Sequence, residues 1–65
     1  MKNHDWTKPY CGVTHKVFDR IQYTIEDHDT FASLMIFSWI SYRRILRESF
    51  ISVADAKEFV SKRIE

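Results

Sequence analysis

The composition of this 65-residue chain is that of a folded protein, because 45% of its residues are hydrophobic and 15% are aromatic, too many for intrinsic disorder. The formal net charge is only +1, so no global field draws the chain to nucleic acid or to an acidic membrane. The length is close to the lower limit for independent folding, and we expect one small domain over residues 1–65. Cys11 is the single cysteine, which precludes an internal disulfide and favours a reducing cytoplasm.

Residues 1–13 contain the only Asn, Pro and Gly of the chain, a composition typical of an irregular N-terminal arm. Trp6 and Tyr10 are the expected anchors of this arm on the body of the protein, or aromatic residues that complete a small core. The first ten residues are polar, and we therefore expect no signal peptide.

Residues 14–26 fit either a helix or a strand. Helical spacing places four apolar residues on one face: Val17, Phe18, Ile21 and Ile25. Strand spacing is equally visible, because Ile21, Tyr23 and Ile25 alternate with polar residues. In the strand interpretation, residues 20–26 form the first strand and residues 27–29 form the turn that follows it.

The main apolar run covers residues 30–47, and it too has two interpretations. As a helix, it carries an apolar stripe that consists of Phe31, Met35, Trp39, Tyr42 and Leu46. As strands, it is rich in the aromatic and β-branched residues that suit a sheet, and its serines compete with helical hydrogen bonds. No glycine is present to form tight hairpins. The apolar part spans residues 31–42, whereas a membrane-spanning helix needs about 20 apolar residues, so we expect a soluble protein.

The C-terminal segment favours the strand interpretation. Ser52 is a candidate N-cap, and Asp55 three residues later completes a capping box. An amphipathic helix is therefore expected over residues 53–64, with Phe50 closing the strand before it. We predict an α+β fold in which a small antiparallel sheet of about three strands packs against this helix. An all-α three-helix bundle is the alternative.

Three strands and a helix over residues 20–64, with a Phe-x-Ser turn at residues 50–52, resemble the integrase-arm and AP2 type of DNA-binding module. In those modules a comparable Phe-x-Ser/Thr turn leads into the helix, and the resemblance implies binding of nucleic acid. The chain departs from them in lacking glycine-rich hairpins and a strongly basic sheet. We therefore do not assign it to either family.

The residues that could carry chemistry match no regular pattern. His4, Cys11 and His15 have no zinc-binding spacing, and a structural zinc site needs four well-placed ligands. His28 lies between Asp27 and Asp29, but no nucleophile, phosphate loop or second acid pair accompanies it. A solvated turn is the favoured interpretation of this segment. We predict no catalytic residues, no metal site, no cofactor and no enzymatic activity.

The arginines beside the apolar run are a further candidate site, because guanidinium groups suit phosphates and carboxylates. On a helix Arg43, Arg44 and Arg47 cluster on one side. On a regular strand Arg43 and Arg47 share one face, while Arg44 points to the other. Lys57, Lys62 and Arg63 support this positive cluster, but Glu48, Asp55, Glu58 and Glu65 dilute it, so an ordinary charged surface is the favoured interpretation.

Surplus apolar surface points to binding of a macromolecule. Phe37, Trp39 and Tyr42, bordered by Arg43 and Arg47, have the composition of an interface hot spot. We predict a small non-enzymatic accessory or regulatory protein, such as an inhibitor, that binds a protein partner or a second copy of itself. Proteins of this size are typical of phage or mobile-element factors that modulate a host protein, and we name such a modulator as a candidate identity on that ground. The alternative is a small nucleic-acid-binding protein that uses Arg43, Arg44 and Arg47.

Overall fold

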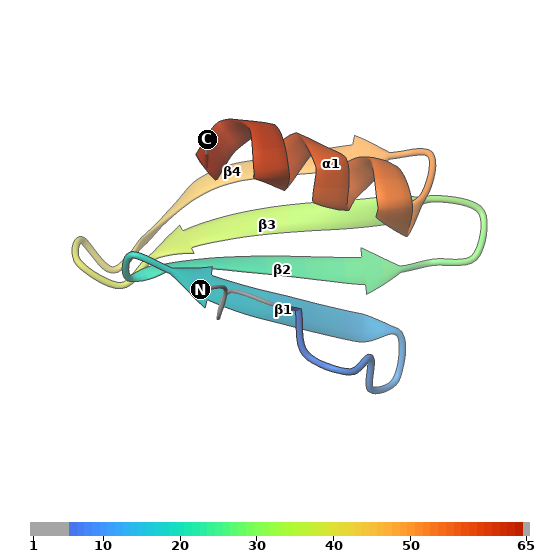
Figure 1. The fold of residues 1–65 in the computed structure, drawn as a ribbon, viewed down its shortest axis with the longest axis horizontal. Helices are drawn as coiled ribbons and strands as arrows, with labels where there is room; N and C mark the ends of the chain where they lie inside the picture. The colour runs from blue at the N-terminus through green and yellow to red at the C-terminus, as the bar shows by residue number, and fades with distance from the viewer. Residues whose placement is uncertain (1–5, 65) are drawn as a thin grey trace.

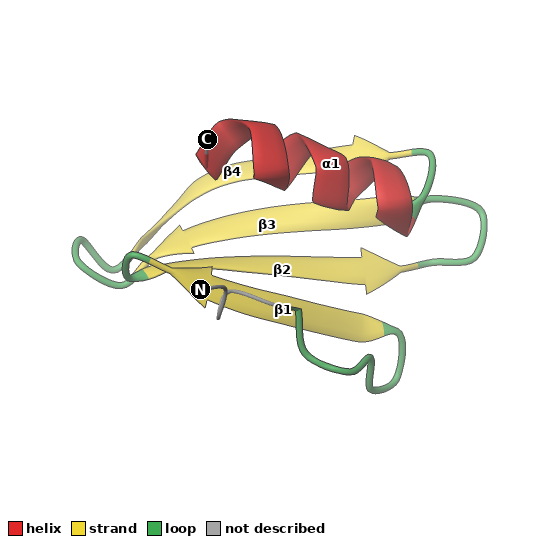
Figure 2. Cartoon of the chain, viewed as in Figure 1, coloured by secondary structure: helices red, strands yellow, loops and turns green. Residues whose placement is uncertain are grey.

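A computed structural model describes residues 6–64, and in it four strands form one antiparallel sheet that lies against a single helix. The elements in chain order are β1 (Val13–Phe18), β2 (Ile21–Asp27), β3 (Ala32–Ser38), β4 (Arg43–Phe50) and α1 (Val53–Ile64). The strand order across the sheet is β1-β2-β3-β4, so each strand pairs with its neighbour in sequence (Figure 1). Figure 2 shows the helix on one side of the sheet and the loops at the two ends of the sheet.

The predicted α+β fold is confirmed, and the molecule is not a three-helix bundle. The sheet has four strands where we expected about three, because residues 13–18 form β1. This strand pairs with β2 along its whole length, from Val13 opposite Glu26 to Phe18 opposite Ile21. The apolar run of the sequence supplies β3, the following loop and the start of β4.

The β1–β2 turn needs no glycine, contrary to our expectation for tight hairpins. Asp19 and Arg20 have φ angles of 55° and 65°, and positive φ at both central residues is the geometry of a type I′ turn. Each residue with a side chain in this region is disfavoured by about 1–2 kcal/mol. Asp tolerates the left-handed region better than most residues, but Arg20 does so only because the paired strands hold it there.

The N-terminal arm is joined to β1 by a second tight turn. Tyr10 and Val13 exchange backbone hydrogen bonds of 2.9 and 3.0 Å, and Gly12 between them has a φ of 77°. A side chain on Gly12 would also approach the carbonyl oxygen of Asp27 to 3.2 Å. The Tyr10 side chain is 80% exposed, so the prediction that Tyr10 anchors the arm is wrong.

Trp6 does anchor the arm. Its ring is partly buried against the core, and the Nζ atoms of Lys16 and Lys57 lie 5.3 and 5.6 Å from the ring centroid, within the range of cation–π attraction. Thr7 continues the arm along β1, since its backbone N–H donates to the His15 carbonyl oxygen at 2.9 Å. Trp6 thus extends the cover of the core beyond the helix, towards β1.

The core lies between the sheet and α1, which packs over β2, β3 and β4. Its fully buried members come from alternating strand positions and one helix stripe: Ile25, Ala32, Leu34, Ile36, Ala56 and Val60. Tyr23 lies on the same side of the sheet, and burial raises the pKa of its phenol above the ordinary value for tyrosine, opposed by Arg63 and assisted by Asp19. We call this side of the sheet the covered face.

The helix begins where the capping box predicts. The Ser52 hydroxyl accepts a hydrogen bond from the Asp55 backbone N–H at 3.2 Å, and the Ser52 carbonyl oxygen accepts one from Ala56 at 3.2 Å. These contacts satisfy amide groups that the first turn of a helix leaves without partners. In the part of the chain that the structure describes, no helix is long and apolar enough to cross a membrane.

Candidate functional site on the open face of the sheet

The side of the sheet opposite the helix carries the candidate site, and we call it the open face. Its side chains form three rows across the strands: Val17, Gln22, Phe37 and Arg44; His15, Thr24, Met35 and Arg47; Val13, Glu26, Ser33 and Ser49. Within residues 6–64 no helix or strand packs over these rows. A pleated sheet directs successive side chains to opposite faces, so the open face and the covered face alternate along every strand.

Three aromatic residues that the sequence analysis assigned to partner binding lie together at one end of the open face. The ring of Trp39 meets the ring of Phe37 edge-on at 5.0 Å and that of Tyr42 at 6.5 Å. Trp39 is 50% exposed and Tyr42 is 75% exposed, while Phe37 is half-buried. We call these residues the aromatic cluster.

Trp39 is held in place although half of it faces solvent. Its indole Nε1–H donates to the Gln22 Oε1 atom at 3.0 Å, and its backbone N–H donates to the Arg20 carbonyl oxygen at 3.0 Å. Both bonds reach across the sheet from the loop after β3 to β2 and the turn before it. The aromatic cluster is therefore a pre-positioned surface, which reduces the entropy lost on binding.

The arginines do not lie as a regular strand would place them. Ile36 pairs with Leu46 but Phe37 pairs with Arg44, so Ile45 is an extra residue on β4. Such a β-bulge reverses the alternation of side chains beyond it. Arg44 and Arg47 consequently share the open face.

Arg43 lies on the other side, since it pairs with Ser38, which belongs to the covered face. The prediction that Arg43 and Arg47 share a face while Arg44 points away is therefore wrong. The sequence gives no signal for the bulge, because no glycine or proline marks it. Of the three arginines named for nucleic-acid binding, only two lie together.

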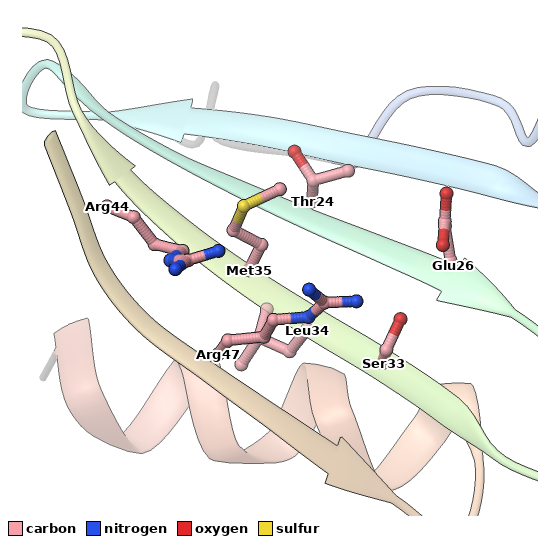
Figure 3. Close-up of a pocket in the computed structure, with 7 residues that line it drawn as sticks. All are labelled: Thr24, Glu26, Ser33, Leu34, Met35, Arg44 and Arg47. Carbon is pink, nitrogen blue, oxygen red and sulfur yellow. The ribbon is translucent and has the colours of Figure 1, made fainter. Parts of the chain in front are cut away.

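A shallow hollow of about 190 Å³ lies between the two guanidinium groups and β2. Its lining consists of Thr24, Glu26, Ser33, Leu34, Met35, Arg44 and Arg47. Figure 3 shows the arginine side chains extending from β4 towards β3, beside Met35 and Ser33. Among the described residues neither guanidinium group forms a salt bridge, so both are available to an anion.

Sequence reasoning missed Thr24 and Ser33, which line the same hollow. The Thr24 hydroxyl accepts a hydrogen bond from Gln22 Nε2 at 3.2 Å, and the Ser33 hydroxyl lies 3.1 Å from His28 Nε2. Met35, which is 39% exposed on the floor of the hollow, was also missed. These residues come from different strands and are adjacent only through the register, in which Thr24 pairs with Met35 and Met35 pairs with Arg47. The polar alternation along residues 22–26 was the available signal, because it marks the face of β2 that the core does not use.

The acidic turn after β2 lies at the far end of the open face. The His28 Nε2 atom lies 3.1 Å from the Ser33 hydroxyl and 3.3 Å from a Glu26 carboxylate oxygen. In a Ser-His-acid triad the acid contacts the other ring nitrogen and orients it, whereas here both contacts use Nε2. The His28 ring also stacks on Phe31 at 4.6 Å. The group orders the turn and lacks the geometry of a triad.

The candidate metal ligands are not brought together within the described chain. No group of three or more His, Cys, Asp or Glu side chains there is placed to hold a metal ion. His4 lies outside the described residues. Cys11 is exposed in its turn, and His15 occupies the middle row of the open face.

Comparisons with protein-family models, with curated proteins and with solved structures give no match. Function is therefore argued from the open face itself. That face combines exposed aromatic rings, two guanidinium groups that form no salt bridge within residues 6–64, and a hollow between them.

Proposed function

We propose that this chain is a non-enzymatic binding protein whose open face docks on a partner protein. The observation that supports this most strongly is the half-exposed Trp39, fixed by a hydrogen bond on a face that no described helix or strand covers. Aromatic residues and arginine are enriched in the parts of interfaces that contribute most to affinity. The aromatic cluster beside Arg44 and Arg47 matches this composition.

A protein partner fits the open face better than nucleic acid does. Proteins that bind DNA tightly through its backbone neutralise about 6–10 phosphates with basic side chains. The open face offers the guanidinium groups of Arg44 and Arg47, and the carboxylate of Glu26 stands at the edge of the same hollow. The net charge of +1 adds little attraction at long range.

A partner other than a second copy of this chain fits the charges better. A two-fold contact that places β4 of one copy over β4 of the other would bring the Arg44 and Arg47 groups of both copies together. Among the described residues in the three rows of the open face, Glu26 is the acid that could oppose them, and it already lies 3.3 Å from its own His28. Uncompensated like charges in an interface are unfavourable by several kcal/mol, so self-association in this arrangement is disfavoured.

An accessory or regulatory role belongs to the same proposal, because a surface that docks on a partner can act on it by occupying a site. We place this action in the reducing cytoplasm, where the exposed thiol of Cys11 stays reduced. A small sheet that is stabilised by a helix on its other face is suited to such a role.

Site-specific photo-crosslinking in the native cells tests the docking face. The photoreactive residue p-benzoylphenylalanine replaces Met35 on the open face, and the matched control carries it at the exposed Glu58 of α1. We expect a discrete protease-sensitive adduct from the Met35 position that excess unmodified protein competes away. The Glu58 position should give no such adduct.

Each other outcome contradicts the proposal in a defined way. A nuclease-sensitive adduct from the Met35 position would favour the nucleic-acid alternative. An adduct of twice the chain's mass, together with a dimer in light scattering, would show self-association. Equal adducts from both positions, or none that unmodified protein competes away, would show that the open face is not a specific docking surface.

A further inference from the structure

The hollow between Arg44 and Arg47 has the features of a site for one anionic group. The guanidinium groups of Arg44 and Arg47 line it from β4, and Thr24 and Ser33 line it from β2 and β3. Arginine donates paired hydrogen bonds that match the two oxygens of a carboxylate. Within residues 6–64 neither Arg44 nor Arg47 pairs with an acid of the chain itself.

The surroundings of the hollow favour a single carboxylate over a chain of phosphates. Met35 lies on its floor, and Phe37 pairs directly with Arg44 at its edge. An acidic side chain next to an apolar one could fill the hollow and cover these neighbours together. Glu26 also lines the hollow, and its carboxylate repels any anion there. The two guanidinium groups can therefore offset one singly charged carboxylate, but they do not supply the several cations that a run of phosphates needs.

We propose that the hollow between Arg44 and Arg47 binds the carboxylate of an aspartate or glutamate on the partner protein, with a large apolar residue beside it on the aromatic cluster. This inference rests on the proposed function and specifies the chemistry of the partner. The nearby Arg43 takes no part, because the bulge in β4 leaves it on the covered side of the sheet.

The probe is a library of random linear peptides displayed on phage and selected on the folded full chain. The selected sequences should be enriched in Asp or Glu adjacent to Trp, Phe, Leu or Met. Fluorescence anisotropy then measures the affinity of the tightest peptide for the chain and for the Arg44→Gln, Arg47→Gln and Arg43→Gln variants. Circular dichroism verifies that each variant is folded.

We expect Arg44→Gln and Arg47→Gln each to weaken peptide binding about tenfold or more, as for loss of a hydrogen bond to a charged group. Arg43→Gln makes the same change in net charge and should leave affinity unchanged. Replacing the acidic residue of the peptide by its amide should weaken binding to the original chain but not to Arg47→Gln. That coupling identifies the two groups as direct partners.

Four results would overturn the carboxylate site. Equal losses in Arg43→Gln and Arg47→Gln would show a non-specific charge effect. The selected peptides could also lack acidic enrichment, and their binding could be abolished by Trp39→Ala but not by Arg47→Gln. That result would support the docking face and contradict only the carboxylate site. Peptides indifferent to all of these substitutions would remove both. A single-stranded oligonucleotide that displaces the peptide in an Arg43-dependent manner would assign the surface to phosphate instead.

Discussion

The two faces of the sheet differ in what covers them, although they are built from the same strands. Leu34 and Met35 are consecutive residues of β3, yet Leu34 is fully buried against the helix and Met35 is 39% exposed. The centre of the covered face is apolar and packs against α1 and Trp6. The open face mixes aromatic, hydroxyl and guanidinium groups. We therefore attribute the stability of the fold to the covered face and propose binding for the open face.

The largest expected effect is on the covered face. Leu34→Ala should lower the free energy of unfolding by about 3 kcal/mol or more, because it removes buried methyl groups and leaves a cavity. Total stability in a domain of this size is about 5 kcal/mol, so much of the protein would unfold. Met35→Ala on the neighbouring position is the matched control and should change stability by less than about 1 kcal/mol.

Urea denaturation followed by circular dichroism measures both variants. Should Leu34→Ala leave too little folded protein to analyse, Ile25→Val provides a milder cut in the same core, with an expected loss of about 1 kcal/mol. Equal losses for Leu34→Ala and Met35→Ala would show that the two faces contribute alike to stability, contrary to our account.

The helix cap has an intermediate expected effect. Ser52→Ala removes the hydroxyl that accepts the Asp55 N–H bond and should destabilise the protein by about 1 kcal/mol. Ser52→Asp retains an acceptor at the helix N-terminus and serves as the control, with stability close to that of the original chain. A thermal midpoint that Ser52→Ala leaves unchanged would mean that the cap does not secure the helix on the covered face.

The smallest expected effect is a gain at the β1–β2 turn. Arg20 has a φ of 65°, a region that glycine adopts without strain. Arg20→Gly should therefore raise stability by about 0.5–1 kcal/mol, after the extra entropy of glycine in the unfolded chain is subtracted. Arg20→Ala removes the same charge without relieving the backbone and should give no gain. A loss of stability in Arg20→Gly would show that this turn is not strained.

The covered face was largely predictable from sequence. The capping box at Ser52 located the start of the helix, and the C-terminal segment favoured strands over a helix for the apolar run. β1 was missed because its two turns put Cys11, Asp19 and Arg20 at positive φ, where glycine or asparagine would have been the usual signal. The sequence therefore predicted the helix, whose capping signal lies in adjacent residues. It missed the turns on either side of β1, whose positive φ angles are imposed by strand pairing.

The open face was predictable only in part. Phe37, Trp39 and Tyr42 were named together because they are near one another in the sequence. The arginines were assigned to the wrong sides because a bulge at Ile45 shifts the register. Thr24 and Ser33 meet Arg44 and Arg47 only through pairing across β2, β3 and β4. Contacts of this kind depend on register, which no single strand encodes.

The most direct test of two faces with different roles is Trp39→Ala, read for stability and for binding in the same protein. The indole is half-exposed and makes one side-chain hydrogen bond, so we predict a loss of stability of about 1 kcal/mol or less. The same variant should lose the photo-adduct formed from the Met35 position. An unfolded Trp39→Ala protein, or a folded one that keeps the adduct unchanged, would contradict the account.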